Sequence, residues 1–192
     1  MDMKGMKIGI CITGSFCTFD KTFEIIEQLK ALGADVTAVI SYAVSQLDTR
    51  FFAANDVQKR LSELTGKDVI KEITTAEPVG PQNLFDVLII LPCTGNTIAK
   101  LANAITDTPV VMAAKSQLRN KKPVIIATST NDGLGNNAKN IGMLMNAENI
   151  YFVPFAQDAP SKKEMSVVFL QELVIDTIET ALNKKQLQPI IR

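Results

Sequence analysis

One run of apolar residues, from position 86 to 91, constrains the fold of this chain more than any other segment. After Asp86 the run is entirely aliphatic, without the alternation of a strand that has one face in water, so it predicts a strand buried on both faces. A helical pattern follows, and the residues between are small and polar: Thr94, Gly95, Asn96 and Thr97. Open α/β sheets bind ligands at the carboxyl ends of their strands. The segment therefore predicts either a ligand-binding loop or an ordinary capped turn.

Strand-like apolar runs alternate with helix-period patterns along the whole chain. This alternation predicts a three-layer, doubly wound α/β fold with a mostly parallel sheet, Rossmann-like or flavodoxin-like, in one domain over residues 1–192. The predicted strands are 7–12, 36–40, 86–91, 124–127 and 150–153. The predicted helices lie between Asp20 and Gly33, between Asn55 and Gly66, over 109–119, near 137–146 and over 166–183.

Capping signals place several helix ends. Asp20 is a candidate N-cap for the first helix, and Asn55 or Asp56 for the second. The segment from Pro109 is ambiguous because Val110, Val111 and Met112 also suit a strand. A capping residue at Asp107 or Thr108, followed by proline at the first helical position, favours a helix there.

The charge balance excludes one class of function. The chain of 192 residues has 20 basic and 20 acidic side chains, so its formal net charge is zero. A nucleic-acid binder that relies on a broad basic face is therefore not expected. Zero net charge also removes the repulsion that opposes self-association, so we expect a homo-oligomer. No stretch of 18 apolar residues is present in the sequence, and we expect no membrane span.

The chain contains no histidine and three cysteines. The lack of histidine excludes catalytic triads that use histidine, metal sites with histidine ligands, and acid–base catalysis by histidine. Cys11, Cys17 and Cys93 form no Cys-x-x-Cys pair, so neither a zinc site nor a disulfide framework is expected. We expect no metal, and a cytoplasmic location.

Three polar loops follow predicted strands, at residues 13–15, 92–97 and 128–132. Parallel strands bring their carboxyl ends to one edge of the sheet, so these loops should converge, with Ser41 nearby. Gly14 allows a tight turn, and Ser15 and Ser41 carry hydroxyls that suit a phosphate. Neither the Gly-x-Gly-x-x-Gly fingerprint nor a Walker A loop is present, so a mononucleotide such as FMN fits better than NAD. An ordinary turn at Gly14 is the alternative.

The strings Thr-Gly-Ser at 13–15 and Pro-Cys-Thr-Gly-Asn-Thr-Ile-Ala-Lys at 92–100 resemble the flavoprotein superfamily that includes the homo-oligomeric flavin-containing cysteine decarboxylases. The resemblance implies an FMN site. By position it assigns the isoalloxazine ring to Thr94, Asn96 and Thr97, and the phosphate end to Gly14, Ser15 and Ser41. Gly95 and Ser129 belong to the same expected cofactor site. It also implies an assembly of trimers, often arranged as dodecamers.

Longer strings extend nearly end to end and are similar to one branch of that superfamily, the B subunits of dipicolinate synthase. The resemblance implies an oxidoreductase component that acts during sporulation, oxidising dihydrodipicolinate or its hydrated precursor to dipicolinate. The implied partner is the A subunit of dipicolinate synthase, which carries the NAD(P) site. The strings are those at 48–51, 77–81, 94–97, 112–115, 118–120, 129–132, 151–158 and 185–189.

The sequence departs from the cysteine decarboxylases at two positions. Pro78 stands where those enzymes have an active-site histidine. Their Pro-Ala-Met-Asn motif aligns with residues 128–131, where only Asn131 is kept. Cysteine decarboxylation is therefore not expected. Prenyl-flavin synthesis, another activity of the superfamily, stays open, because its motifs are also short polar loops.

Arg50, Asn131 and Asp132 are the candidate catalytic residues. A dicarboxylate substrate needs cations, and Arg50 in the loop after the second strand matches a carboxylate in a bidentate geometry. Asn131 is a candidate hydrogen-bond donor, and Asp132 a candidate proton acceptor. The alternatives are a solvated charge at Arg50, an Asx-turn at Asn131 and a cap at Asp132. A non-catalytic assembly component with a relic nucleotide pocket is the competing function.

Overall fold

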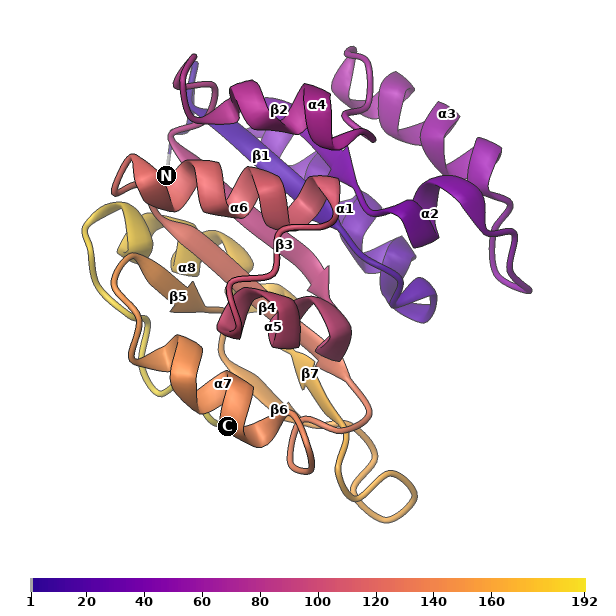
Figure 1. Ribbon diagram of the computed structural model, residues 1–192, viewed down its shortest axis with the longest axis vertical. Helices are drawn as coiled ribbons and strands as arrows, with labels where there is room; N and C mark the ends of the chain where they lie inside the picture. Colours follow the sequence, from indigo (N-terminus) through magenta and orange to yellow (C-terminus); the bar gives the residue numbers. More distant parts are fainter. Residues whose placement is uncertain (1) are drawn as a thin grey trace.

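The computed structural model describes residues 2–192, and its central feature is a sheet of seven strands. Five of the strands run parallel, in the order β2-β1-β3-β4-β5 (Figure 1). This arrangement confirms the predicted doubly wound α/β fold. The parallel strands are β1 (Lys7–Ile12), β2 (Asp35–Ile40), β3 (Val87–Cys93), β4 (Val124–Thr130) and β5 (Ile150–Phe152).

Helices cover both faces of the sheet. Alternation along β1 sends Ile8, Ile10 and Ile12 to a core shared with α1 and α8, whereas Cys11 faces the core beneath α5, α6 and α7. Figure 1 shows α4 to α7 in front of the sheet. Within residues 2–192, no helix has the length and apolar content needed to cross a membrane. The helices are α1 (Phe19–Ala31), α2 (Tyr42–Gln46), α3 (Ala54–Thr65), α4 (Ile73–Ala76), α5 (Gly95–Ala102), α6 (Pro109–Arg119), α7 (Ala138–Met145) and α8 (Val174–Leu182), with 3-10 turns at Phe16–Thr18, Glu77–Val79 and Gln171–Leu173.

The predicted final helix over 166–183 was wrong in its first part. Residues Val167–Phe169 form strand β7, which pairs antiparallel with both β4 and β6 (Phe155–Gln157), and helix α8 begins only at Val174. Val167 and Val168 are β-branched and pair with Thr130 and Ser129 of β4. Tertiary pairing therefore decides the structure of a segment whose apolar pattern also suits a helix.

The central strand extends further than predicted. β3 runs to Cys93, and all seven of its residues are buried. The register of its pairing with β4 shifts between Ile90 and Cys93, where Pro92 has no N–H to give to the ladder. Only Thr94 separates β3 from α5, so the polar residues from Gly95 onward lie in the first turn of a helix.

Two predicted caps were wrong and one was right. Helix α1 begins at Phe19, so Asp20 lies in its first turn. Helix α3 begins at Ala54, and neither Asn55 nor Asp56 caps it; the distant Asp48 Oδ1 accepts the Ala54 N–H at 2.8 Å instead. The prediction for α6 is confirmed.

In α6, the Thr108 side chain accepts the Val111 N–H at 3.4 Å, and Pro109 occupies the first helical position. Gly66, predicted to end the second helix, caps α3 at φ 72°, in the left-handed region that glycine adopts without strain.

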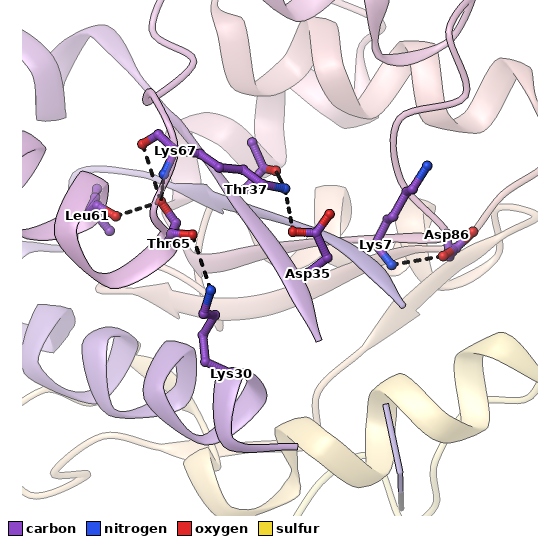
Figure 2. Close-up of polar contacts among 8 residues, drawn as sticks. All are labelled: Lys7, Lys30, Asp35, Thr37, Leu61, Thr65, Lys67 and Asp86. Carbon is purple, nitrogen blue, oxygen red and sulfur yellow. Dashed lines mark hydrogen bonds and ion pairs between the residues drawn. The ribbon is translucent and has the colours of Figure 1, made fainter. Parts of the chain in front are cut away.

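The end of α3 is fixed to the neighbouring elements by polar contacts at the amino edge of the sheet (Figure 2). Lys67 Nζ lies 2.6 Å from Asp35 Oδ1 and donates to Thr37 Oγ1 at 3.0 Å, both on β2. Lys30 Nζ of α1 donates to the Thr65 carbonyl at 3.2 Å. These contacts hold the return from α3, and with it the first half of the sheet.

A pair of glycine substitutions tests the packing. A Cβ at Gly9, on β1, would lie 2.6 Å from the buried ring of Phe85, so Gly9→Ala should lower the free energy of unfolding by about 1–3 kcal/mol. Gly142, inside α7, has open space around its Cβ position. Gly142→Ala should raise the free energy by about 0.5–1 kcal/mol through helix propensity. Urea unfolding monitored by circular dichroism measures the change in the free energy of unfolding in each variant. Changes of the same sign and size in the two variants would contradict the packing described.

Candidate functional site

A cavity of about 350 Å³ lies at the carboxyl edge of the sheet, where β1, β3 and β4 end. The three loops predicted to converge there all contribute to it, and so does the start of α7. The lining residues are Gly14, Ser15, Thr94, Gly95, Asn96, Ser129, Thr130, Asn131, Asp132 and Asn137.

Three of the predicted site residues lie outside this lining. Thr97 is buried behind it, with its Oγ1 3.2 Å from Thr94 Oγ1. Ser41 lies at the end of β2, before α2. Arg50 is exposed, with Cζ 4.8 Å from the centre of the Phe51 ring.

Two lining residues were not predicted, Thr130 and Asn137. Thr130 belongs to the polar run at 128–132, so its position was within reach of the sequence argument. Asn137 is the N-cap residue of α7, but its approach to the cavity depends on the fold of the intervening turn. No motif in the sequence predicts that turn.

The hydroxyl of Thr13 joins the first two loops. Thr13 is 1% exposed, and its Oγ1 donates to the Pro92 carbonyl at 2.8 Å while accepting the Thr94 N–H at 2.9 Å. Across the cavity, Ser15 Oγ and Ser129 Oγ lie 2.7 Å apart and join the first loop to the third. The three loops are therefore linked by hydrogen bonds into one rim.

Asp132 is held by a chain of amide and hydroxyl donors. Its Oδ1 accepts from Thr130 Oγ1 at 2.6 Å, and its Oδ2 accepts from Asn137 Nδ2 at 2.8 Å. Asn137 Oδ1 in turn accepts from Asn140 Nδ2 at 2.8 Å. Both carboxylate oxygens thus have fixed donors, and the orientation of the carboxylate is set before any ligand arrives.

The side chains of Asn96 and Asn131 make no hydrogen bond among residues 2–192. The Asx-turn considered for Asn131 is therefore not formed in the part of the chain described. Each amide offers two N–H donors and one carbonyl acceptor to the cavity. It can therefore bind the polar edge of a heterocycle or a carboxylate.

Gly95 is the position in this site that requires glycine. A Cβ there would lie 2.5 Å from Thr130 Oγ1, 2.6 Å from Asn137 Nδ2 and 2.8 Å from Asp132 Oδ1. At Gly14 the nearest atom, on the Phe16 ring, would be 3.4 Å away, an ordinary contact, and its φ lies outside the left-handed region. The tight turn that glycine was expected to allow at position 14 thus has a backbone that other residues also adopt, as in the alternative of an ordinary turn.

The cavity carries little charge. Among the residues that the structure describes, Asp132 is the one charged residue of the lining. Lys100, on α5, is paired with Asp107 at 2.8 Å, and Lys115 of α6 lines a separate apolar groove. No group of three or more Cys, Asp and Glu side chains within residues 2–192 is placed to hold a metal ion. Hydroxyls, amides and backbone atoms therefore dominate the chemistry of the site.

Two buried hydroxyls near this edge have no hydrogen-bond partner in the described chain, Ser41 Oγ and Thr128 Oγ1. An unpaired buried hydroxyl costs about 1–3 kcal/mol, so such groups indicate a missing partner. Ser41 precedes α2, and Ala43 of that helix lies 3.6 Å from the Cβ position of Gly14. The hydroxyl and amide donors present can bind the polar edge of a ring and can donate hydrogen bonds to a phosphate, without supplying positive charge.

The three thiols differ in accessibility. Burial raises the pKa of Cys11, and burial followed by the nearby Cys11 raises the pKa of Cys93, whereas Cys17 is exposed. The two buried thiols stay protonated through neutral pH and are poor nucleophiles. We expect a disulfide reagent such as DTNB to label one thiol per native chain and three in urea. Rapid labelling of more than one native thiol would contradict this.

Thr13→Val tests the link between the loops. Valine matches the shape of threonine but removes the hydroxyl that serves the Pro92 carbonyl and the Thr94 N–H. We expect a loss of about 1–3 kcal/mol in the free energy of unfolding. The control is Thr75→Val on exposed α4, where the lost bond is local and the change should stay within about 0.5 kcal/mol. A similar loss in both variants would contradict the role of Thr13.

Comparison with known proteins assigns the class. The model of the Flavoprotein family matches residues 1–180, and the chain belongs to this family. Within it, the chain is 47% identical over 189 residues to the B subunit of dipicolinate synthase from Bacillus subtilis (strain 168), covering 98% of this chain and 94% of that protein.

Solved structures agree with this assignment. The B subunit of dipicolinate synthase from Bacillus halodurans C superposes with a TM-score of 0.91 at 42% identity, covering 100% of this chain and 98% of that one. The FMN-dependent cysteine decarboxylase SpaF superposes with a TM-score of 0.70 at 18% identity, covering 94% and 97% of the two chains. At that identity the likeness shows a shared fold alone.

Proposed function

We propose that this chain is the flavin-type component of a dipicolinate synthase. In this role it oxidises dihydrodipicolinate, or its hydrated precursor, to dipicolinate in the cytoplasm during sporulation. The observation that carries the proposal is the polar cavity at the carboxyl edge, in a chain 47% identical to a dipicolinate synthase B subunit. The partner is the A subunit of the synthase, which carries the NAD(P) site, and the chain itself forms trimers or dodecamers.

The residues at the cavity suit FMN. Gly14, Ser15 and Ser41 would hold the phosphate end, where the unpaired Ser41 hydroxyl gains a partner. Thr94, Gly95, Asn96 and Ser129 would hold the ring, and Thr97, buried behind them, would orient the Thr94 hydroxyl. The lack of a side chain at Gly95 lets α5 pack directly against Thr130, Asp132 and Asn137. When bound, the flavin supplies the capacity to accept a hydride.

The protein supplies orientation around the reacting ring. The free amide of Asn131 binds a substrate carboxylate, and the fixed carboxylate of Asp132 accepts a proton. Because no lysine or arginine from residues 2–192 lines the cavity, the charge of a dicarboxylate needs a cation from outside the lining. Arg50 is the candidate from this chain, and a neighbouring chain of the assembly is the other source.

Gly95→Ala tests the proposal. Its added methyl group would displace the donors around Asp132, so we expect loss of FMN uptake and loss of dipicolinate formation in the presence of the A subunit. Visible absorbance after addition of FMN and desalting measures uptake, and ultraviolet absorbance of the product measures turnover. Gly142→Ala, an exposed change on α7, is the matched control and should keep both. Wild-type protein that takes up no FMN, whether or not the A subunit is present, would refute the flavin role.

A second candidate, an assembly component without chemistry of its own, is favoured by the lack of a cation in the lining over the described residues. Turnover by the isolated A subunit separates the two. Full activity without this chain supports the assembly role, whereas activity that requires wild-type chain and fails with Gly95→Ala supports the flavin role.

A further inference from the structure

A second cleft, of about 700 Å³, lies at the opposite edge of the sheet. It is bounded by Lys121 before β4, by residues 145–151 from the end of α7 into β5, and by residues 184–190 after α8. Helix α7 runs between the two sites: Asn137, its N-cap, lines the cavity, and Met145, its last residue, lines the cleft, about 12 Å away at 1.5 Å per residue. The two sites therefore lie at opposite ends of α7 and share no lining residue within the described chain.

The C-terminal segment forms one wall of the cleft, and it is fixed in place. The amide of Gln186 accepts the Phe152 N–H at 2.8 Å and donates to the Phe152 carbonyl at 2.7 Å, so that it occupies the free edge of β5. Further on, the Phe155 N–H donates to the Ile190 carbonyl at 3.0 Å. Figure 1 shows this segment, in yellow, descending from α8 past α7 to the C-terminus.

Alternate positions of this segment line the cleft: Lys184, Gln186, Gln188 and Ile190. The wall therefore offers the Lys184 ammonium, the Gln188 amide and the aliphatic side chain of Ile190 to a ligand. The Gln186 amide is occupied by the Phe152 backbone and the Leu187 carbonyl.

The remaining lining combines positive charge with apolar surface. Lys121 and Lys184 are exposed, and neither forms an ion pair among the residues that the structure describes. Within the same residues, Glu148 is the one carboxylate of the lining. Tyr151 is 8% exposed, and its hydroxyl makes no hydrogen bond in the described chain; burial raises its pKa, so the hydroxyl stays protonated. Met145, Ala147 and Ile150 add apolar surface.

We propose that this cleft is a binding site for a small organic anion, an apolar or aromatic ring that carries carboxylates. The ring packs on the aliphatic side chains, and the carboxylates meet the two lysines and the amide of Gln188. Over residues 2–192, the carboxyl-edge cavity offers hydroxyls and amides without a lysine or arginine, so the two sites select different ligands. The proposal does not depend on the flavin role.

In the test, benzene-1,3-dicarboxylate is added as the probe to the full ¹⁵N-labelled chain, and the changes in the backbone amide chemical shifts are measured. We expect saturable shifts centred on residues 149–151 and 184–190. The double variant Lys121→Ala/Lys184→Ala should raise the Kd for the probe about tenfold, which corresponds to about 1.4 kcal/mol of binding free energy. The matched control, Lys139→Ala/Lys162→Ala, removes the same charge from exposed positions outside the cleft and should leave the affinity unchanged.

Three results would overturn the proposal. They are no saturable shift at the cleft, equal weakening by the two double variants, and inorganic phosphate binding at the same amides as tightly as the probe. The last result would show that charge alone, without the apolar wall, attracts the anion. Retained circular dichroism in both double variants establishes that a lost affinity is not a lost fold.

Discussion

The candidate site depends on the hydrogen bonds that the hydroxyl of Thr13 makes with Pro92 and Thr94. The parallel pairing of β1 with β3 continues from Ile8 and Val87 to Cys11 and Ile90, which brings Thr13 beside Pro92. Pro92 has no N–H to give, but its carbonyl accepts both the Thr13 N–H at 3.3 Å and the Thr13 hydroxyl, and the same hydroxyl accepts the Thr94 N–H. Helix α5 can then start immediately, with Asn96 in its first turn at the edge of the sheet.

The third loop depends on the antiparallel strand β7. Pairing of Val167 with Thr130 fixes the end of β4, and the Leu134 N–H donates to the Met165 carbonyl at 3.0 Å. The chain turns after Asp132, whose carbonyl accepts the Gly135 N–H at 2.9 Å and the Asn137 N–H at 3.1 Å, and this turn brings the Asn137 amide to the Asp132 carboxylate. A segment outside the parallel sheet thus sets the orientation of the carboxylate in the cavity.

The sequence predicted the parallel core because long aliphatic runs have few other structures available. It also predicted α6, because Thr108 and Pro109 act locally. It failed where the decisive partner was distant. Strand β7 exists through its pairing with β4 and β6, and α3 is capped by Asp48 from outside the helix. For the same reason the loops could be predicted to converge, whereas the approach of Asn137 and the distance of Arg50 from the lining could not.

The distribution of charge links the two edges of the sheet. At the carboxyl edge, Asp132 would repel a dicarboxylate, and no lining cation from residues 2–192 offsets the loss of the anion's hydration. At the amino edge, two lysines border an apolar cleft. A small anion released in solution is therefore attracted to the edge opposite the proposed chemistry, unless a second chain brings a cation to the carboxyl edge. A substrate anion at the proposed flavin site therefore needs a cation from Arg50 or from a neighbouring chain, whereas both lysines of the proposed amino-edge site belong to this chain.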